Sequence, residues 1–308
     1  MQFETFSLTA TDGRLIPCFA WRDEENAARA TVQIAHGMGE HAQRYAGLAE
    51  ALTNQGFAVY ASTHRGHGEG ARATPGAMGP NGWRSTVGDM HELARFIRSR
   101  HAGLRHVLFG HSMGAMLTQQ YLTLHGGELD AAVLSGSPGF APGWRGWLLQ
   151  ALASFEAWRH GADGQSELLT NMLFGASNES FDKPEATGYE WLSRDELEVE
   201  KYVQDPDCGF VLSPGSLAAM SRGVRRSAQP VAIEQIPQSL PVYVFSGSDD
   251  PVHDDENGLL RLLRAYRGAG LSVDYKLYPG GRHEMLNETN RVEVVADLLA
   301  WLDAKLAP

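Results

Sequence analysis

Six short apolar runs, each ending in small or polar residues, constrain the fold of this chain more than any other feature. They are TVQIAHG (31–37), FAVYAST (57–63), HVLFGHS (106–112), DAAVLSGS (130–137), PVYVFSGSDD (241–250) and SVDYKLYPGG (272–281). Stretches with helical spacing lie between most of them, and two end in glycine, as helix C-termini often do. Strands that alternate with helices need crossover connections, which build a mainly parallel sheet covered on both faces. The sequence therefore predicts an α/β fold.

The first 23 residues follow a different pattern. FETFSLTA (3–10) and LIPCFAWRD (15–23) place apolar residues at alternate positions, and TDG (11–13) between them is a turn sequence. This pattern predicts a β-hairpin before the parallel strands.

One long segment interrupts the alternation. Residues 139–235 contain no convincing core strand, but several helix-like pieces rich in Trp, Phe and Leu. Nearly a hundred residues are too many for a loop in a compact domain. We therefore expect a core made of residues 1–138 and 236–308, with 139–235 inserted as a helical lid. The lid should cover the carboxyl ends of the strands, where open α/β sheets bind their ligands.

Charge and cysteine content exclude several classes of function. The net charge is −11, and the densest basic cluster, RGVRR (222–226), is short, which argues against nucleic acid as a partner. Cys18 and Cys208 cannot form a disulfide framework, and neither has a second ligand at a spacing typical of metal sites. We expect both to be free thiols in a reducing compartment.

The chain start and the apolar runs bear on localisation. The start, MQFETFSLTATDGRL, has neither the basic residues nor the apolar stretch of a signal peptide. No run approaches the roughly 18–20 apolar residues of a membrane span. A soluble, cytoplasmic protein is the expectation.

Ser112 lies between two glycines where an apolar run gives way to a helical pattern. Gly110-His111-Ser112-Met113-Gly114 fits G-x-S-x-G, which in this context forms a sharp strand-to-helix turn that exposes the serine Oγ. The free N–H groups and the positive dipole end of the following helix would face the reacting carbonyl. We interpret Ser112 as a nucleophile.

A nucleophilic serine needs a base, and the base needs an orienting carboxylate. In this architecture the acid and then the histidine follow the serine, each at the end of a later strand. Asp249 and Asp250 meet the first condition, and His283 meets the second. Pro251 biases Asp250 toward an extended backbone, so we choose Asp250 and keep Asp249 as the alternative.

Acyl transfer also needs N–H donors for the oxyanion. Met113, directly after the nucleophile, should supply one donor, and Met38 in the loop HGMGEHAQRY (36–45) should supply the other. We expect the side chains of Glu40 and His41 to cap the following helix or to bond the loop.

Several histidines could be mistaken for metal ligands. His36, His64, His67 and His253 show no H-E-x-x-H or other tight ligand spacing. The sequence therefore predicts no catalytic metal and no cofactor.

Taken together, HGMGEHAQRY, YASTHRGHGEG, GHSMGA, SGSDDPV and YPGGRHEMLNE resemble the α/β-hydrolase superfamily, and within it the monoacylglycerol lipase and lysophospholipase branch. The resemblance spans nearly the whole chain and implies Ser112 as nucleophile, Asp250 as acid, His283 as base, and the amides of Met38 and Met113 as oxyanion hole. Two positions depart from the family pattern. Thr63 stands where relatives usually have Asp, and Ala115 replaces the last glycine of GHSMGG.

One helix-like piece of the expected lid carries an apolar stripe. Its members are Trp144, Trp147, Leu148, Leu152, Phe155 and Trp158. The stripe either packs the lid onto the core or, in part, lines an acyl pocket or touches a lipid surface, with Trp144, Trp147 and Leu148 as candidate substrate contacts. With little positive charge beside the stripe, any membrane contact should be peripheral.

The expected activity is hydrolysis of a small-molecule ester, preferably a single-chain lipid such as a monoacylglycerol or lysophospholipid, through an acyl-enzyme on Ser112. The alternatives use the same triad on other bonds: a short-chain esterase, an amidase or aminopeptidase, or a carbon–carbon hydrolase. A non-catalytic ligand-binding protein with this fold is a further alternative, which the intact set of Ser112, Asp250 and His283 argues against.

Overall fold

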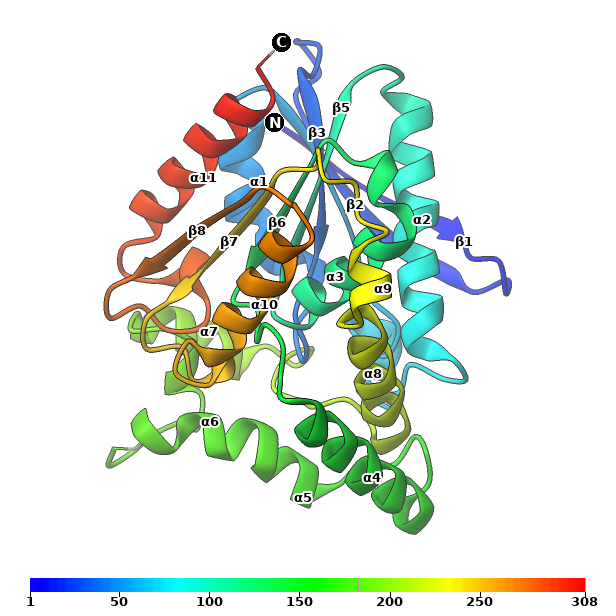
Figure 1. Cartoon of the computed structure of the whole chain (residues 1–308), viewed down its shortest axis with the longest axis vertical. Helices are drawn as coiled ribbons and strands as arrows, with labels where there is room; N and C mark the ends of the chain where they lie inside the picture. The colour runs from blue at the N-terminus through cyan, green and yellow to red at the C-terminus, as the bar shows by residue number, and fades with distance from the viewer. Residues whose placement is uncertain (182, 308) are drawn as a thin grey trace.

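The computed structural model describes residues 1–181 and 183–307. Eight strands form one sheet in the order β1-β2-β4-β3-β5-β6-β7-β8 (Figure 1). Their bounds are Gln2–Thr9 (β1), Leu15–Arg22 (β2), Ala30–Ala35 (β3), Phe57–Ser62 (β4), Arg105–His111 (β5), Ala131–Ser135 (β6), Val242–Gly247 (β7) and Val273–Tyr278 (β8). The six predicted parallel strands and the hairpin are all present.

The direction of pairing follows the sequence pattern. β1 pairs antiparallel with β2, and β2 pairs antiparallel with β4, whereas all pairs among β3 to β8 are parallel. Every residue of β3, β4, β6 and β7 is buried. Continuous apolar runs are what parallel strands require, because helices cover both faces of such a sheet.

Helices cover the two faces in two groups. The core helices are α1 (Ala46–Thr53), α2 (Gly82–Arg100), α3 (Met113–His125), α10 (Asn257–Gly268) and α11 (Arg291–Lys305). Leu52 of α1 and Leu298 of α11 pack in one apolar cluster with Phe109 and Phe245 of the sheet. The helices α2, α3 and α10 pack in another cluster on the other face.

The connection between β6 and β7 carries the remaining α-helices and a π-helix. They are α4 (Gly143–His160), α5 (Glu167–Thr170), the π-helix η4 (Asn171–Gly175), α6 (Ala176–Asn178), α7 (Glu196–Gln204), α8 (Pro214–Ser227) and α9 (Pro230–Ile233). We call residues 139–235 the cap segment; both of its ends fall in loops, and its described residues contain no strand. Figure 1 shows α4, α5 and α6 as a layer at the end of the molecule opposite both termini.

The cap segment is not uniformly separate from the sheet. Leu217 and Met220 of α8 belong to the same apolar cluster as Leu117 and Leu122 of α3. The α8 helix therefore takes the place of an ordinary crossover helix between β6 and β7, while α4, α5 and α6 extend beyond it.

No helix in the described part of the chain is both long enough and apolar enough to cross a lipid bilayer.

Candidate active site

Ser112 occupies the sharp turn between β5 and α3. Its backbone has φ 53° and ψ −115°, in a region that L-residues rarely adopt, and it is the residue that precedes the first turn of α3. Strained residues of this kind are held in place by their surroundings and are concentrated at functional sites.

The two glycines around Ser112 are required by close contacts. A Cβ atom on Gly110 would lie 2.4 Å from the Gly114 carbonyl oxygen and 2.4 Å from Thr118 Oγ1. A Cβ atom on Gly114 would lie 2.0 Å from the Ala35 carbonyl oxygen. Helix α3 can therefore approach both β5 and the end of β3 only because these two positions lack a side chain.

Three side chains from the ends of three strands form a chain of hydrogen bonds. Ser112 follows β5, Asp250 follows β7 and His283 follows β8. His283 Nε2 lies 2.9 Å from Ser112 Oγ, and His283 Nδ1 lies 3.0 Å from Asp250 Oδ2. This is the geometry in which an imidazole can accept a serine proton while a carboxylate fixes its tautomer.

The carboxylate of Asp250 is held by further donors. Ser246 donates its hydroxyl to Oδ2 at 2.6 Å, and the Val252 backbone N–H donates to Oδ1 at 3.0 Å. Asp249, the alternative acid, is exposed and accepts a hydrogen bond from the neighbouring Ser248 hydroxyl. The structure thus brings Asp250, and not Asp249, to His283.

The surroundings of Asp250 and His283 favour the charged form of both side chains, although burial alone would disfavour it. Burial raises the pKa of Asp250, but the facing His283 and the hydrogen bonds outweigh it, so the pKa lies below its ordinary value. Burial lowers the pKa of His283, but Asp250 outweighs it and the pKa lies above its ordinary value. The pair therefore stabilises the imidazolium that proton transfer from a serine would create.

The loop after β3 brings Met38 into the cavity beside Ser112. Among the backbone hydrogen bonds of the described residues, neither the Met38 nor the Met113 N–H has an acceptor. The two predicted oxyanion donors are thus both free of backbone partners.

Gly37, the residue before Met38, is held by hydrogen bonds at both its N–H and its carbonyl. Glu40 Oε1 accepts the Gly37 N–H, and His36 Nδ1 lies 2.8 Å from the Gly37 carbonyl oxygen. His36 Nε2 accepts the His64 N–H at 2.9 Å, so the ring proton is on Nδ1 and donates to Gly37. Glu40 therefore bonds the loop, one of the two expected roles. The part played by His36 was missed in the sequence because its partner His64 belongs to another strand end.

Three buried histidine rings lie behind this loop. The His36 and His64 ring centroids are 4.1 Å apart, and those of His36 and His67 are 5.1 Å apart. Burial lowers the pKa of His36 and of His67 to about 3. These neutral rings pack against one another, and their donor atoms do not form a group with metal-ligand separations.

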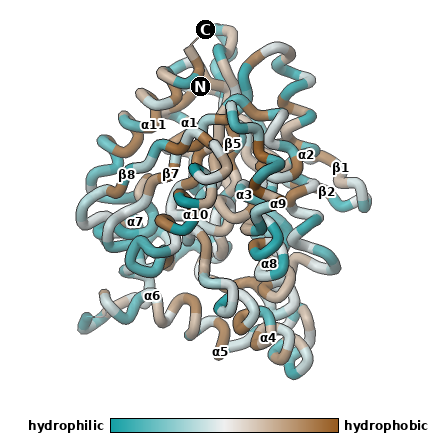
Figure 2. Tube along the Cα trace, viewed as in Figure 1, coloured by the Kyte–Doolittle hydropathy of each residue, from teal (hydrophilic) through white to brown (hydrophobic). Residues whose placement is uncertain are grey.

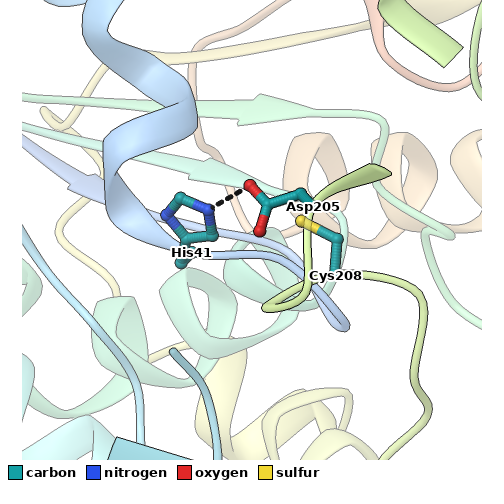
Figure 3. A group of neighbouring side chains, drawn as sticks. All are labelled: His41, Asp205 and Cys208. Carbon is teal, nitrogen blue, oxygen red and sulfur yellow. Dashed lines mark hydrogen bonds and ion pairs between the residues drawn. The ribbon is translucent and has the colours of Figure 1, made fainter. Parts of the chain in front are cut away.

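A different group has such separations. The donor atoms of His41, Asp205 and Cys208 all lie within 4.8 Å of one another (Figure 3). The prediction that neither cysteine has a second ligand nearby is therefore wrong for Cys208. The spacing of Asp205 and Cys208, three residues apart, was visible in the sequence, but the third member lies 164 positions from Asp205.

The Ser112 and His283 side chains open into a cavity of about 640 Å³ between the core and the cap segment. Most of its lining is apolar, and the apolar side chains include Met116, Phe140, Leu149, Leu173, Phe174, Trp191, Met220 and Val224. The volume lies within the ~300–1,000 Å³ that is usual for small-molecule sites.

The predicted substrate contacts on α4 lie elsewhere. Trp144, Trp147 and Leu148 are 63%, 63% and 60% exposed, and among the described residues they are outside the lining of this cavity. Phe155 and Trp158 are exposed as well, so most of the stripe faces outward instead of packing onto the core. Figure 2 shows hydrophobic stretches along α4. Leu149 of α4 lines the cavity, and Leu152 and Ala153 pack against the core.

Comparisons with known proteins match nearly the whole chain. The family model described as serine aminopeptidase S33 matches residues 26–290. A monoacylglycerol lipase from Mycolicibacterium smegmatis is 29% identical over 282 residues, which cover 90% of this chain and 89% of that protein. Human monoglyceride lipase is 24% identical and covers 97% of this chain and 90% of its own length.

Solved structures agree with these matches. A carboxyl esterase from Bacillus coagulans, determined in complex with glycerol, superimposes with a TM-score of 0.90 at 26% identity over the full length of both chains. A structure described as the open form of a lipase gives a TM-score of 0.88 at 27% identity, again over both full chains.

Proposed function

The chain belongs to the serine aminopeptidase S33 family and is a serine ester hydrolase with the α/β-hydrolase fold, and from this we propose that Ser112, His283 and Asp250 are its catalytic triad. The observation that carries the proposal is the hydrogen-bonded chain from Ser112 through His283 to Asp250 at the base of an apolar cavity.

The proposed reaction proceeds through an acyl-enzyme. Ser112 Oγ attacks the ester carbonyl while His283 Nε2 takes its proton, and Asp250 stabilises the imidazolium. The Met38 and Met113 N–H groups donate to the oxyanion, which becomes negative only as the tetrahedral species forms. His283 then protonates the leaving alcohol, and a water molecule, activated by the same imidazole, releases the acid.

The proposed substrate is a single-chain lipid ester such as a monoacylglycerol. The largely apolar lining supports an acyl chain, and the named activities of the relatives support a glycerol ester. A lysophospholipid fits the same chain and ester, and differs in its headgroup.

An aminopeptidase reaction, named in the family description, finds less support in the cavity. Such an enzyme needs a carboxylate free to receive the substrate's ammonium group. Among the described residues, the lining carboxylates are Glu40, Glu284 and Asp254. Glu40 and Glu284 both accept hydrogen bonds from Arg44, and Asp254 lies 2.9 Å from Arg145. Each carboxylate is thus already paired with a guanidinium, with Glu40 and Glu284 sharing that of Arg44.

We also propose that the outward face of α4 makes peripheral contact with a lipid surface. Trp144, Trp147 and Trp158 are 63%, 63% and 79% exposed on one helix, which is unusual for large aromatic side chains. Because the cavity lies beneath α4, a substrate leaving the lipid would have a short path to Ser112.

The test is covalent labelling followed by turnover. A fluorophosphonate should give a single adduct that peptide mapping assigns to Ser112, and His283→Ala should slow the labelling severely. The labelled enzyme should lose hydrolysis of monoacylglycerols. Ser112→Ala that is folded by circular dichroism yet keeps full esterase activity would overturn the assignment, and faster turnover of an aminoacyl arylamide than of any ester would overturn the substrate class.

A further inference from the structure

Two segments distant in sequence meet beside the loop that carries Met38. His41 directly precedes the short helix η1 (Ala42–Tyr45), and Asp205 directly follows α7 in the cap segment. Cys208 comes three residues later. In Figure 3 the three side chains face a common space, and His41 Nε2 lies 2.9 Å from Asp205 Oδ2.

The separations suit a small metal ion. Zinc binds imidazole nitrogen and carboxylate oxygen at about 2.0–2.2 Å and thiolate sulfur at about 2.3 Å. Two such bonds at a tetrahedral angle separate their donor atoms by roughly 3.3–3.7 Å. All three donor atoms lie within 4.8 Å of one another, so modest side-chain adjustments would bring them to these distances.

The backbone around Asp205 and Cys208 already holds two of the donors in one turn. The Cys208 N–H donates to the Asp205 carbonyl at 3.1 Å, and the Asp207 N–H donates to Asp205 Oδ1 at 2.9 Å. Ligands three residues apart in a turn, completed by a third ligand from a facing segment, are a common arrangement in zinc sites. Asp205 Oδ2 is the oxygen that remains for a metal.

The donor set also has the right chemistry and access. Imidazole, thiolate and carboxylate together favour zinc over magnesium or calcium, which prefer oxygen ligands alone. The side chains of His41 and Asp205 are 13% and 29% exposed, and Cys208 is only partly buried, so an ion can enter from solvent.

We propose that His41 Nε2, Asp205 Oδ2 and Cys208 Sγ form a zinc site, with water in the fourth position. Binding forms the zinc–sulfur bond as the thiol releases its proton to solvent. The proton that His41 Nε2 now donates to Asp205 Oδ2 moves to Nδ1 or to solvent, which frees both atoms to bind the metal. Burial raises the pKa of the Cys208 thiol, so the proton stays on sulfur until the metal displaces it. The site does not depend on the proposed function, because none of its members belongs to the proposed triad.

Zinc would add a metal bridge to the contact between the Met38 loop and the cap segment, which hydrogen bonds now hold. The Gly39 carbonyl accepts the Gly209 N–H at 3.0 Å and the Tyr202 hydroxyl at 2.8 Å. The bound ion would form a further link between the loop that carries Met38 and the cap segment. It should therefore raise the melting temperature of the protein.

The test uses the untagged full chain, stripped of metal, and two readouts. Calorimetric titration should give one high-affinity Zn²⁺ per chain, and Co²⁺ should produce a thiolate-to-metal charge-transfer absorption. Cys208→Ser should abolish that absorption and weaken Zn²⁺ binding at least about tenfold, since even outer-shell changes cost about that much. Asp205→Asn should weaken binding as well, which covers the case of a poorly folded Cys208 variant.

Matched controls separate this site from others. Cys18→Ser removes the other, buried cysteine and should leave Zn²⁺ binding unchanged. A second group with metal-ligand separations consists of His91 on α2, His125 at the end of α3 and Glu128 in the short 3-10 helix η3 (Gly126–Glu128) that follows. His125→Ala should have no effect on the charge-transfer absorption or on the first Zn²⁺ bound. Binding unaffected by Cys208→Ser, binding lost only in His125→Ala, or no Zn²⁺ retained would each overturn the proposal.

Discussion

In the proposed triad Asp250 fixes the tautomer of His283, because its carboxylate faces Nδ1 while Nε2 faces Ser112. Replacement by asparagine keeps the shape of the side chain but allows the ring proton to move to Nε2. A protonated Nε2 cannot accept a proton from serine.

Asp250→Asn should therefore lower kcat by about 10⁴-fold. The matched control is Asp249→Asn, one residue earlier and exposed, which should leave kcat near that of the wild type. Steady-state hydrolysis of a soluble ester checks both variants. Equal losses of kcat in the two variants would mean that activity depends on the structure of the loop and not on the Asp250 carboxylate.

The same pair predicts how activity depends on pH. Only neutral His283 can take the Ser112 proton, and Asp250 keeps the pKa of His283 above its ordinary value of 6.5. The value of kcat/KM should therefore rise with pH and reach half of its maximum above pH 6.5. In Asp250→Asn burial remains but the negative charge does not, so the residual activity should reach half of its maximum at a lower pH than in the wild type. Identical midpoints in the two proteins would contradict this account.

Two helices of the core differ in how much they tolerate a side chain at glycine. Gly88 lies in α2, is exposed, and a Cβ atom there would have nothing within 4 Å, whereas Gly114 of α3 lies against the Ala35 carbonyl. Similar sequence positions in helices thus have opposite requirements.

Gly88→Ala should raise the free energy of unfolding by about 0.5–1 kcal/mol, because alanine loses less backbone entropy in a helix. Gly114→Ala should lower it by about 1–3 kcal/mol or more, because the Ala35 carbonyl at the end of β3 must move away. Urea denaturation measures both. A stable, fully active Gly114→Ala protein would show that the turn does not depend on this contact.

The α4 helix carries the prediction about lipid surfaces. Trp144→Ser combined with Trp158→Ser should weaken binding to phosphatidylcholine vesicles at least about tenfold, since each buried aromatic side chain contributes about 1.5–3 kcal/mol. Leu124→Ser is the control, because Leu124 is 59% exposed on α3 and lies outside the cap segment. Vesicle co-sedimentation measures the binding. Equal binding by the double variant and the wild type would refute the contact.

The parts of the whole molecule that follow from a local sequence pattern could be predicted. The apolar runs predicted the strands. Ser112, Asp250 and His283 follow three of the predicted strands, and their side chains form a chain of hydrogen bonds at the carboxyl ends of the parallel strands. The orientation of α4 could not be predicted, because an apolar stripe looks the same whether it faces the core or solvent. Two other features depend on tertiary contacts between segments far apart in sequence. They are the hydrogen bond between His36 and Gly37 and the proximity of His41 to Cys208.

The positions of the three strands that carry the proposed triad have a consequence for protein synthesis. Ser112 follows β5, but Asp250 and His283 follow β7 and β8, and β8 is the edge strand that pairs only with β7. His283 is residue 283 of 308. A growing chain on the ribosome can therefore expose the serine turn long before it can activate the serine. The proposed triad is complete only after β8 and the loop behind it have been made, so a product that ends before His283 lacks the proposed base.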